Sequence, residues 1–404
     1  MKRGSLIIIL VAISMVIVLM AMGCGGGSTT AAQTGPIKIG HIFNMTGPEA
    51  IVGSLQKAGF DYAFKSMNYQ VEGREIQVIE GDAGGAPATS VDVARKMVEQ
   101  DKVVAIFGPT EIGQKNAVAG YCKQAKIPLI LYNPTPSSIL ENNKWVVAAG
   151  GTNLQSPSCM GDYLFTHLGY KTITTLTLDD SAGRAFMDPL TKVFIANGGT
   201  VVQQQWVAAG TTDFAPYLNA VKDAGSMVAW MPGDAAIKFL TQFHQLGIDK
   251  KMPVHGAFHG GFIDPFIPAQ MAESDAEALI AGQASAPSMW DPGNQDPVNL
   301  AFIKGFRAIA KQPPTDDTTA EPAQAAMLFQ AAVTATKGNT SPDKLLAALI
   351  STPIVGPCGP MSFGGKQAKT ANVYIVKITH PAAFTYQTVY TYKDVPPEGF
   401  TVKK

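Results

Sequence analysis

The sequence has no excess of charge of either sign, because 31 Lys and Arg residues balance 31 Asp and Glu residues. Binding to nucleic acid or to an anionic membrane surface calls for a clustered basic excess, so neither partner is indicated. Charged residues make up only 15% of the chain, whereas hydrophobic residues make up 46%. This composition favours folded domains with a large core over a disordered chain.

Cysteine is scarce, with four residues in a chain of 404. Cys24 lies near the N-terminus, and Cys122, Cys159 and Cys358 are spread through the rest of the chain. An odd number of cysteines in this part leaves at least one thiol unpaired, and no pair has the spacing of a metal site. We expect Cys122 and Cys159, which fall in helical patterns, to be buried free thiols.

The common catalytic and nucleotide-binding motifs are missing. The chain contains no G-x-S-x-G, no Walker loop, no G-x-G-x-x-G and no H-E-x-x-H. His255 and His259 are four residues apart, but their segment, HGAFHGG, is rich in glycine and follows a predicted strand, which indicates a loop. We therefore expect no enzyme, no cofactor and no metal site, and a secreted α/β hydrolase remains the weaker alternative.

Long apolar runs are confined to the N-terminus. Lys2 and Arg3 precede the uncharged stretch from Ser5 to Met22, which is the layout of a secretory signal. Ala21-Met22-Gly23-Cys24 resembles the bacterial lipoprotein box, in which the cysteine sulfur accepts a lipid. We expect residues 1–23 to be a signal peptide and Cys24 to be lipidated, with an uncleaved anchor as the alternative.

Residues 24–36 carry no charge and are rich in glycine and serine, which predicts a flexible tether. Both interpretations of the N-terminus place the rest of the chain outside the cytoplasm. The protein would then be periplasmic or at the cell surface, held to a membrane through its lipid anchor.

From residue 37 onward, short β-rich runs alternate with amphipathic helical runs. Strands are predicted at 37–43, 75–82, 103–109, 127–133, 171–180, 200–210, 226–233, 252–258, 278–287, 359–363 and 371–379. Helical patterns lie between them, and residues 297–350 form a helical block. The alternation predicts an α/β fold with two doubly wound parallel-sheet units.

Several segments resemble one known family, the type I periplasmic binding proteins of branched-chain amino acid ABC transporters. The segments are IKIGHIFNMTGPEAIVG, VVAIFGPTEIG, IPLILYNPTPSSIL, DDSAGRAF, IVGPCGPMSFGG and ANVYIVKI, in the family's order. The resemblance implies two lobes joined by a three-segment hinge. Lobe 1 would comprise 37–152 plus 286–370, and lobe 2 would comprise 153–285 plus 371–404. It also implies a small-molecule ligand in the cleft and an ABC permease of the branched-chain amino acid type as partner.

Candidate ligand-binding residues follow strands that feed helices, where free N–H groups can hold a carboxylate. The resemblance places Thr135 where the family has a threonine that bonds the ligand. The candidates are Thr110, Glu111, Ile112, Asn133 and Thr135 in lobe 1, and Ala182, Asp234 and Phe258 in lobe 2.

Some candidates depart from the family pattern. Family members that bind branched-chain amino acids carry tyrosine, serine and tyrosine where this chain has Val52, Ile112 and Ala182. Their acidic residue for the ligand ammonium has no clear counterpart, although Glu111 or Asp234 could replace it. The ligand class therefore stays open between an amino acid and an aliphatic or aromatic acid. A ligand-sensing ectodomain with the same fold is a further alternative.

Overall fold

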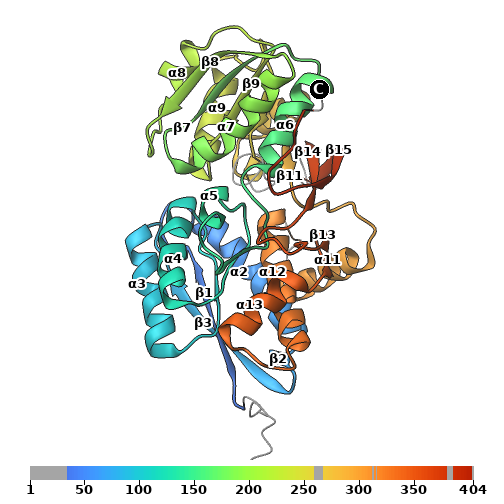
Figure 1. The fold of residues 1–404 in the computed structure, drawn as a ribbon. Coiled ribbons are helices and arrows are strands. Elements are labelled where there is room, and N and C mark those ends of the chain that lie inside the picture. The colour runs from blue at the N-terminus through green and yellow to red at the C-terminus, as the bar shows by residue number, and fades with distance from the viewer. Residues whose placement is uncertain (1–33, 259–266, 312–313, 315, 380–384, 403–404) are drawn as a thin grey trace, which may run out of the picture. The chain divides into compact units, whose positions relative to one another are not determined.

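The computed structural model describes residues 34–258, 267–311, 314, 316–379 and 385–402 (Figure 1). The predicted signal peptide, Cys24 and most of the tether lie outside the described residues, as does His259. The chain divides into Met1–Thr34 and a compact unit, Gly35–Lys404, which carries every element described below. None of the helices in the described residues has the length and apolar character that a membrane crossing requires.

Lobe 1 is the part of this unit built on a six-stranded sheet, in the order β2-β3-β1-β4-β5-β6. β1 pairs in parallel with β3 and β4, and β5 pairs in parallel with β4 and β6. The strands are β1 (Ile37–Phe43), β2 (Gln70–Val71), β3 (Arg74–Asp82), β4 (Ile106–Phe107), β5 (Leu129–Leu131) and β6 (Val146–Ala148).

Helices cover both faces of this sheet, which makes it doubly wound. One face packs against α3 and α4 around Ile42, Val118 and Leu129, and the other packs against α2, α12 and α13 around Phe60 and Phe329. The helices of lobe 1 are α2 (Ala50–Ser66), α3 (Pro87–Lys96), α4 (Ile112–Ala125), α5 (Ser137–Leu140), α11 (Pro297–Ala310), α12 (Asp317–Ala335) and α13 (Pro342–Ser351). The predicted helical block at 297–350 is confirmed as α11 to α13.

Lobe 2 is the part built on a four-stranded parallel sheet, in the order β10-β9-β7-β8. Its strands are β7 (Thr172–Leu178), β8 (Thr200–Val207), β9 (Ser226–Trp230) and β10 (Val254–Gly256). Its helices are α6 (Gln155–Thr166), α7 (Ser181–Ala196), α8 (Ala215–Asn219), α9 (Asp234–Gln245) and α10 (Glu273–Ala281). The α/β class with parallel-sheet lobes is confirmed.

A three-stranded antiparallel sheet, β11-β14-β15, packs into the core of lobe 2 through Val373 and Ile375. It consists of β11 (Ser285–Ser288), β14 (Ala371–Thr379) and β15 (Thr385–Val395). β12 (Ile354–Gly356) and β13 (Gly359–Met361) form a separate hairpin. The sequence analysis did not predict β15.

The described cysteines Cys122, Cys159 and Cys358 are free thiols, and Cys122 and Cys159 are buried, as expected for these two.

The strand predicted at 278–287 is wrong over most of its length. Residues 278–281 form the last turn of α10, and only Ser285–Ser288 of that region is a strand. Ala276 and Leu279 bury one face of α10, and Glu273 and Asp275 suit its first turn. The short apolar run fits a buried helix end as well as a strand, so its periodicity could not separate the two.

Chain crossings between the lobes are tied together by two side chains. Gln155 accepts a hydrogen bond from the N–H of Thr152 at 2.8 Å and donates to the carbonyls of Lys369 at 3.1 Å and Val395 at 2.8 Å. Asp317 accepts from the N–H of Met289 at 2.7 Å. Because β11 pairs with β14 of lobe 2, the second crossing lies after Ser288 rather than at residue 286.

We expect Gly59→Ala to destabilise the protein because a Cβ at Gly59 would lie 1.9 Å from the carbonyl oxygen of Thr319 in α12. Overpacking against a backbone atom costs about 1–3 kcal/mol, which urea unfolding would detect. Gly120→Ala is the matched control, because Gly120 in α4 has open space around its Cβ position. That control should be neutral or stabilising by about 0.5–1 kcal/mol. Equal effects of the two substitutions would contradict the packing of α2 on α12.

Candidate functional site

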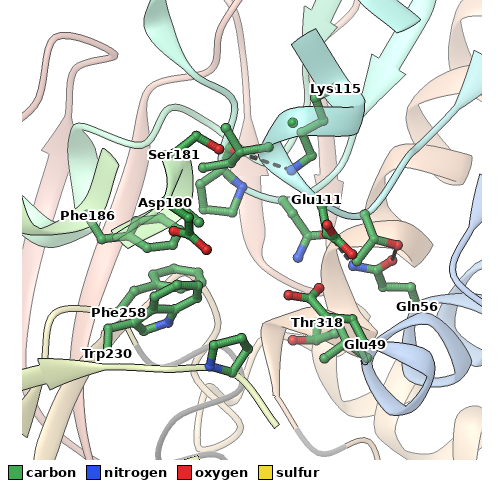
Figure 2. A pocket seen from close by; sticks show the side chains of 18 residues that line it. Glu49, Gln56, Glu111, Lys115, Asp180, Ser181, Phe186, Trp230, Phe258 and Thr318 are labelled. Atoms are coloured by element: carbon green, nitrogen blue, oxygen red, sulfur yellow. Dashed lines mark hydrogen bonds between the residues drawn. The ribbon is translucent and has the colours of Figure 1, made fainter. Parts of the chain in front are cut away.

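A cavity of about 120 Å³ lies where the two lobes meet (Figure 2). One water molecule needs about 10–15 Å³ of such a volume, so the cavity has room for a ligand of on the order of ten non-hydrogen atoms. Its lining includes Glu49, Val52, Gln56, Thr110, Glu111, Ile112, Gly113, Lys115, Asn133, Pro134 and Thr318 from lobe 1. Lobe 2 contributes Asp180, Ser181, Ala182, Phe186, Trp230, Pro232 and Phe258. The lining lies at the carboxyl ends of the parallel strands, where α/β sheets bind ligands.

Three carboxylates stand at the N-terminal ends of helices around this cavity. Glu49 is the N-cap residue of α2, Glu111 that of α4 and Asp180 that of α7. The Asp180 carboxylate accepts from the N–H of Gly183 at 2.7 Å, whereas Glu49 makes no capping hydrogen bond. Acidic residues suit these positions because a helix N-terminus carries partial positive charge.

Glu111 is held in place by polar neighbours. Its Oε1 accepts a hydrogen bond from Asn44 Nδ2 at 2.8 Å, and Asn44 Oδ1 accepts from Gln114 Nε2 at 2.9 Å. Gln114 also completes a capping box, because its Oε1 accepts from the N–H of Glu111 at 3.0 Å. The direction of the Glu111 carboxylate is therefore set before any ligand arrives.

A second polar network joins Gln56, Thr110 and Asn133 on the lobe 1 side. The Thr110 hydroxyl donates to Gln56 Oε1 at 2.8 Å, and Gln56 Nε2 donates to Asn133 Oδ1 at 2.9 Å. Gln56 is fully buried. These bonds fix the amide of Asn133 beside the cavity.

Lys115 brings a cation to the same cavity from the next turn of α4. Its side chain is almost completely buried and donates to the carbonyl of Pro134 at 3.1 Å. Burial lowers the pKa of Lys115 to about 8, while the nearby carboxylates of Glu321 and Glu49 oppose that decrease. An ammonium has three donors, so Lys115 can contact a ligand as well as Pro134.

The wall from lobe 2 is aromatic. Phe186 stacks on Phe258 with ring centroids 4.7 Å apart, and it meets Trp230 edge-on at 4.9 Å. Figure 2 shows these three rings on the side of the cavity opposite Glu49 and Glu111. Such a wall suits an apolar or aromatic ligand group, and aromatic faces also attract cations.

Neighbouring negative charges help to raise the pKa of two carboxyl groups at this cavity, those of Glu49 and Glu111. Burial raises the pKa of Glu49 to about 8, and the carboxylates of Glu111 and Asp180 add to the effect. Burial and the charge of Asp180 also raise the pKa of Glu111, while its bond from Asn44 lowers it. The repulsion between Glu49 and Glu111 acts within lobe 1, whereas the smaller repulsion from Asp180 acts between the lobes.

Six of the eight predicted site residues line the cavity. They are Thr110, Glu111, Ile112, Asn133, Ala182 and Phe258. Thr135 does not line it: the residue is buried in a bridge with Thr152, and its hydroxyl lies 3.5 Å from the carbonyl oxygen of Asn133. Asp234 is exposed in the first turn of α9, where its negative charge interacts favourably with the helix dipole.

The sequence analysis did not single out Glu49, Gln56 or Lys115. One signal was available, because Lys115 stands four residues after Glu111 and such residues share a helix face. Glu49 and Gln56 gave no such signal, since they reach the cavity only through the packing of α2 on α12.

Comparison with known proteins places the chain in a family. A family model described as periplasmic binding protein matches residues 36–383. The chain belongs to the periplasmic binding protein family. Within this family, Leu/Ile/Val-binding protein homolog 6 of Brucella suis is 25% identical over 378 residues, covering 92% of this chain and 94% of the relative. The leucine-, isoleucine-, valine-, threonine- and alanine-binding protein of Pseudomonas aeruginosa is 25% identical, covering 86% and 90%.

A solved periplasmic binding protein has the same fold. The solute-binding protein of an ABC transporter from Rhodopseudomonas palustris, in complex with 3,4-dihydroxybenzoic acid, superposes with a TM-score of 0.81 at 25% identity. The match covers 90% of this chain and 98% of that one. The family consists of substrate-binding proteins, so this chain is a solute-binding protein of the ABC transporter type rather than an enzyme.

The protonation of Glu49 makes stability depend on pH. Its folded pKa of about 8 exceeds the ordinary value of 4.5, so wild-type stability should fall as pH rises through this window. The full shift corresponds to at most about 5 kcal/mol, but Glu49 is only half-buried and solvent screens its charge. Glu49→Gln should therefore be more stable than wild type by roughly 1–2 kcal/mol above about pH 8, and equal to it below about pH 4.5. Urea unfolding of both proteins at the two pH values would measure the difference.

Glu141→Gln is the control for this prediction, because Glu141 is exposed and the substitution should leave the pH dependence of wild type unchanged. If Glu49→Gln followed the wild-type pH curve throughout, Glu49 would titrate normally in the folded protein.

Proposed function

We propose that the protein is the lipid-anchored extracytoplasmic receptor of an ABC importer and captures a small amino acid with an apolar side chain between its lobes. Cys24 would carry the anchor, and the partner would be an ABC permease of the branched-chain amino acid type. The observation that carries the ligand proposal is the set of three carboxylates, Glu49, Glu111 and Asp180, opposite an aromatic wall.

A ligand ammonium would be held by these carboxylates, and its charge would lower the pKa of Glu49 from about 8, so that Glu49 ionises as the ligand binds. A buried ammonium needs anionic or carbonyl partners to replace its hydration, and here the partners come from both lobes. Glu49 is suited to the role because its carboxylate makes no capping bond of its own. The missing acidic residue of the family pattern would thus be replaced by residues at helix N-termini.

A ligand carboxylate has a separate set of donors in the same cavity. The N–H groups of Ile112 and Gly113 are the first two of α4 and precede its hydrogen-bond ladder. Lys115 adds an ammonium from the next turn. Donors of this kind bind a carboxylate without an arginine. The apolar side chain of the ligand would then lie against Phe186, Trp230 and Phe258.

Closure of the lobes would depend on the ligand's charge. Glu49 and Glu111 belong to lobe 1 and Asp180 to lobe 2, so closing an empty cavity brings like charges together. A ligand cation removes this repulsion only in the closed state, and that difference shifts the population toward closure. Ile112 already packs into the core cluster of lobe 2, which shows where the lobes make contact.

An aromatic acid without an amino group is the second candidate. Lys115 lines the same cavity as the stacked rings of Phe186 and Phe258, and this favours it, because one cation and an aromatic wall suffice for such a ligand. The related proteins include both kinds, since one is named for leucine, isoleucine and valine and another was solved with a benzoic acid derivative.

Thermal shift of the fragment from Gln33 onward should separate the two candidates. A ligand that binds only the folded protein raises the melting temperature by mass action. We expect leucine or phenylalanine to raise it, whereas isocaproate and hydrocinnamate, which lack the amine, and isopentylamine, which lacks the carboxylate, should have little effect. A response to benzoate or hydrocinnamate alone would favour the aromatic-acid candidate. The absence of any response would favour a sensor of another ligand class.

Asp180→Asn should weaken amino acid binding by about tenfold to a hundredfold, the worth of one hydrogen bond to a charged group. Asparagine caps helices as well as aspartate does, so α7 should keep its N-terminus. Asp179→Asn is the matched control: Asp179 is exposed and pairs with Arg184, and its loss should leave affinity unchanged. Titration calorimetry would measure both. Equal affinities for wild type and Asp180→Asn would remove Asp180 from the proposed ammonium site.

A further inference from the structure

A second cavity lies in lobe 2 at the opposite end of β7 from the cleft. Its volume is about 290 Å³, and its polar lining consists of Tyr163, Tyr170, His255, Gln283, Ser285 and Lys377. Tyr170 precedes β7 and Asp180 follows it, so the two cavities are separated by roughly 30 Å of extended chain. The volume approaches the lower end of the range for small-molecule sites.

His255 is the buried polar group at the centre of this lining. Its side chain is 2% exposed, and its Nδ1 shares a hydrogen bond of 2.8 Å with the Ser285 hydroxyl. Its Nε2 is buried and has no hydrogen-bond partner among the residues that the structure describes. Buried polar atoms are normally paired, so this ring nitrogen lacks the partner that such an atom ordinarily has, and the ring is a sensitive reporter of changes in the cavity that His255 lines. Burial lowers the pKa of His255 to about 4, so the ring is neutral at physiological pH.

The charge of the described lining is positive and comes from Lys377. Lys377 stands opposite Ser285 in the antiparallel pairing of β11 with β14. No acidic residue is among the described residues that line the cavity, which also carries the hydroxyls of Tyr163 and Tyr170. A lysine with hydroxyl and amide donors is a set that binds an oxyanion. The cleft differs, because three carboxylates line it.

At the rim of this cavity, a glutamine occupies a backbone position that usually has glycine. Gln283 follows the C-terminal end of α10 with a φ of 54°, a left-handed conformation that usually falls to glycine at helix ends. Gly282, its neighbour, does not take the left-handed position. Because this position is occupied by glutamine instead of glycine, a side-chain amide lines the cavity here.

We propose that this cavity is a second binding site, for a small organic carboxylate anion. Lys377 supplies the charge, the hydroxyls of Tyr163 and Tyr170 supply hydrogen bonds, and Leu168 and Val389 supply apolar contact. The site does not depend on which ligand occupies the cleft.

NMR of the histidine rings tests this proposal directly, because the chain has only six histidines. The fragment from Gln33 onward is titrated with propionate and with benzoate, and His255 is assigned by its loss in His255→Gln. We expect the ring signal of His255 to shift and saturate. In Lys377→Met the apparent affinity should be at least about tenfold weaker, since a charged partner is lost. Lys393→Met, which removes an exposed cation from the neighbouring strand β15, should behave as wild type.

Two outcomes would overturn the proposal. If the His255 signal does not move with either acid, or moves equally with sodium chloride, the cavity holds only water. If the shift keeps its midpoint in Lys377→Met, it reports binding at the cleft transmitted through lobe 2. Unchanged signals of the other histidines in both lysine variants would show that the fold is intact. A failure here leaves the proposed amino acid site untouched, because that site is measured by Asp180→Asn.

Discussion

Helix N-termini that meet between the lobes are the constraint on which the binding site depends. Each βα unit of a parallel sheet brings a helix N-terminus to the carboxyl edge of the sheet, so α2, α4 and α7 all begin at the cavity. Their positive ends would attract an anion. Here each already has an acidic side chain, and the site is therefore negative where the fold alone would make it positive.

In the proposed function, this arrangement would connect ligand recognition with movement. Lobe 1 contributes Glu49 and Glu111, and lobe 2 contributes Asp180, so the repulsion of Asp180 with the other two carboxylates would grow as the lobes approach. The lobes themselves are well-packed bodies with separate cores. The side chains of Gln155 and Asp317 hydrogen-bond to backbone groups of the segments that cross between the lobes. A change in the angle between the lobes would therefore be confined to a few residues of these segments.

The fold was predictable because its signals are local and repeated. Strands β1, β3, β7 and β14 were found within a residue or two, since each has an apolar core flanked by turn residues. The error at 278–281 arose where a helix end and a strand have the same apolar pattern. β15 alternates polar with aromatic or β-branched residues, which is a strand pattern, and the sequence analysis overlooked it.

The site was predictable only in part. The sequence alone determined the loops with Thr110, Glu111, Ile112 and Asn133, because strand ends that feed helices can be read from periodicity. Ala182 and Phe258 came from the family resemblance. Tertiary structure decided the rest. Whether Thr135 faces the cavity or a neighbouring strand, and whether Glu49 and Lys115 reach it at all, depends on how helices pack against a sheet. Side-chain direction is set by those long-range contacts, which a local pattern does not contain.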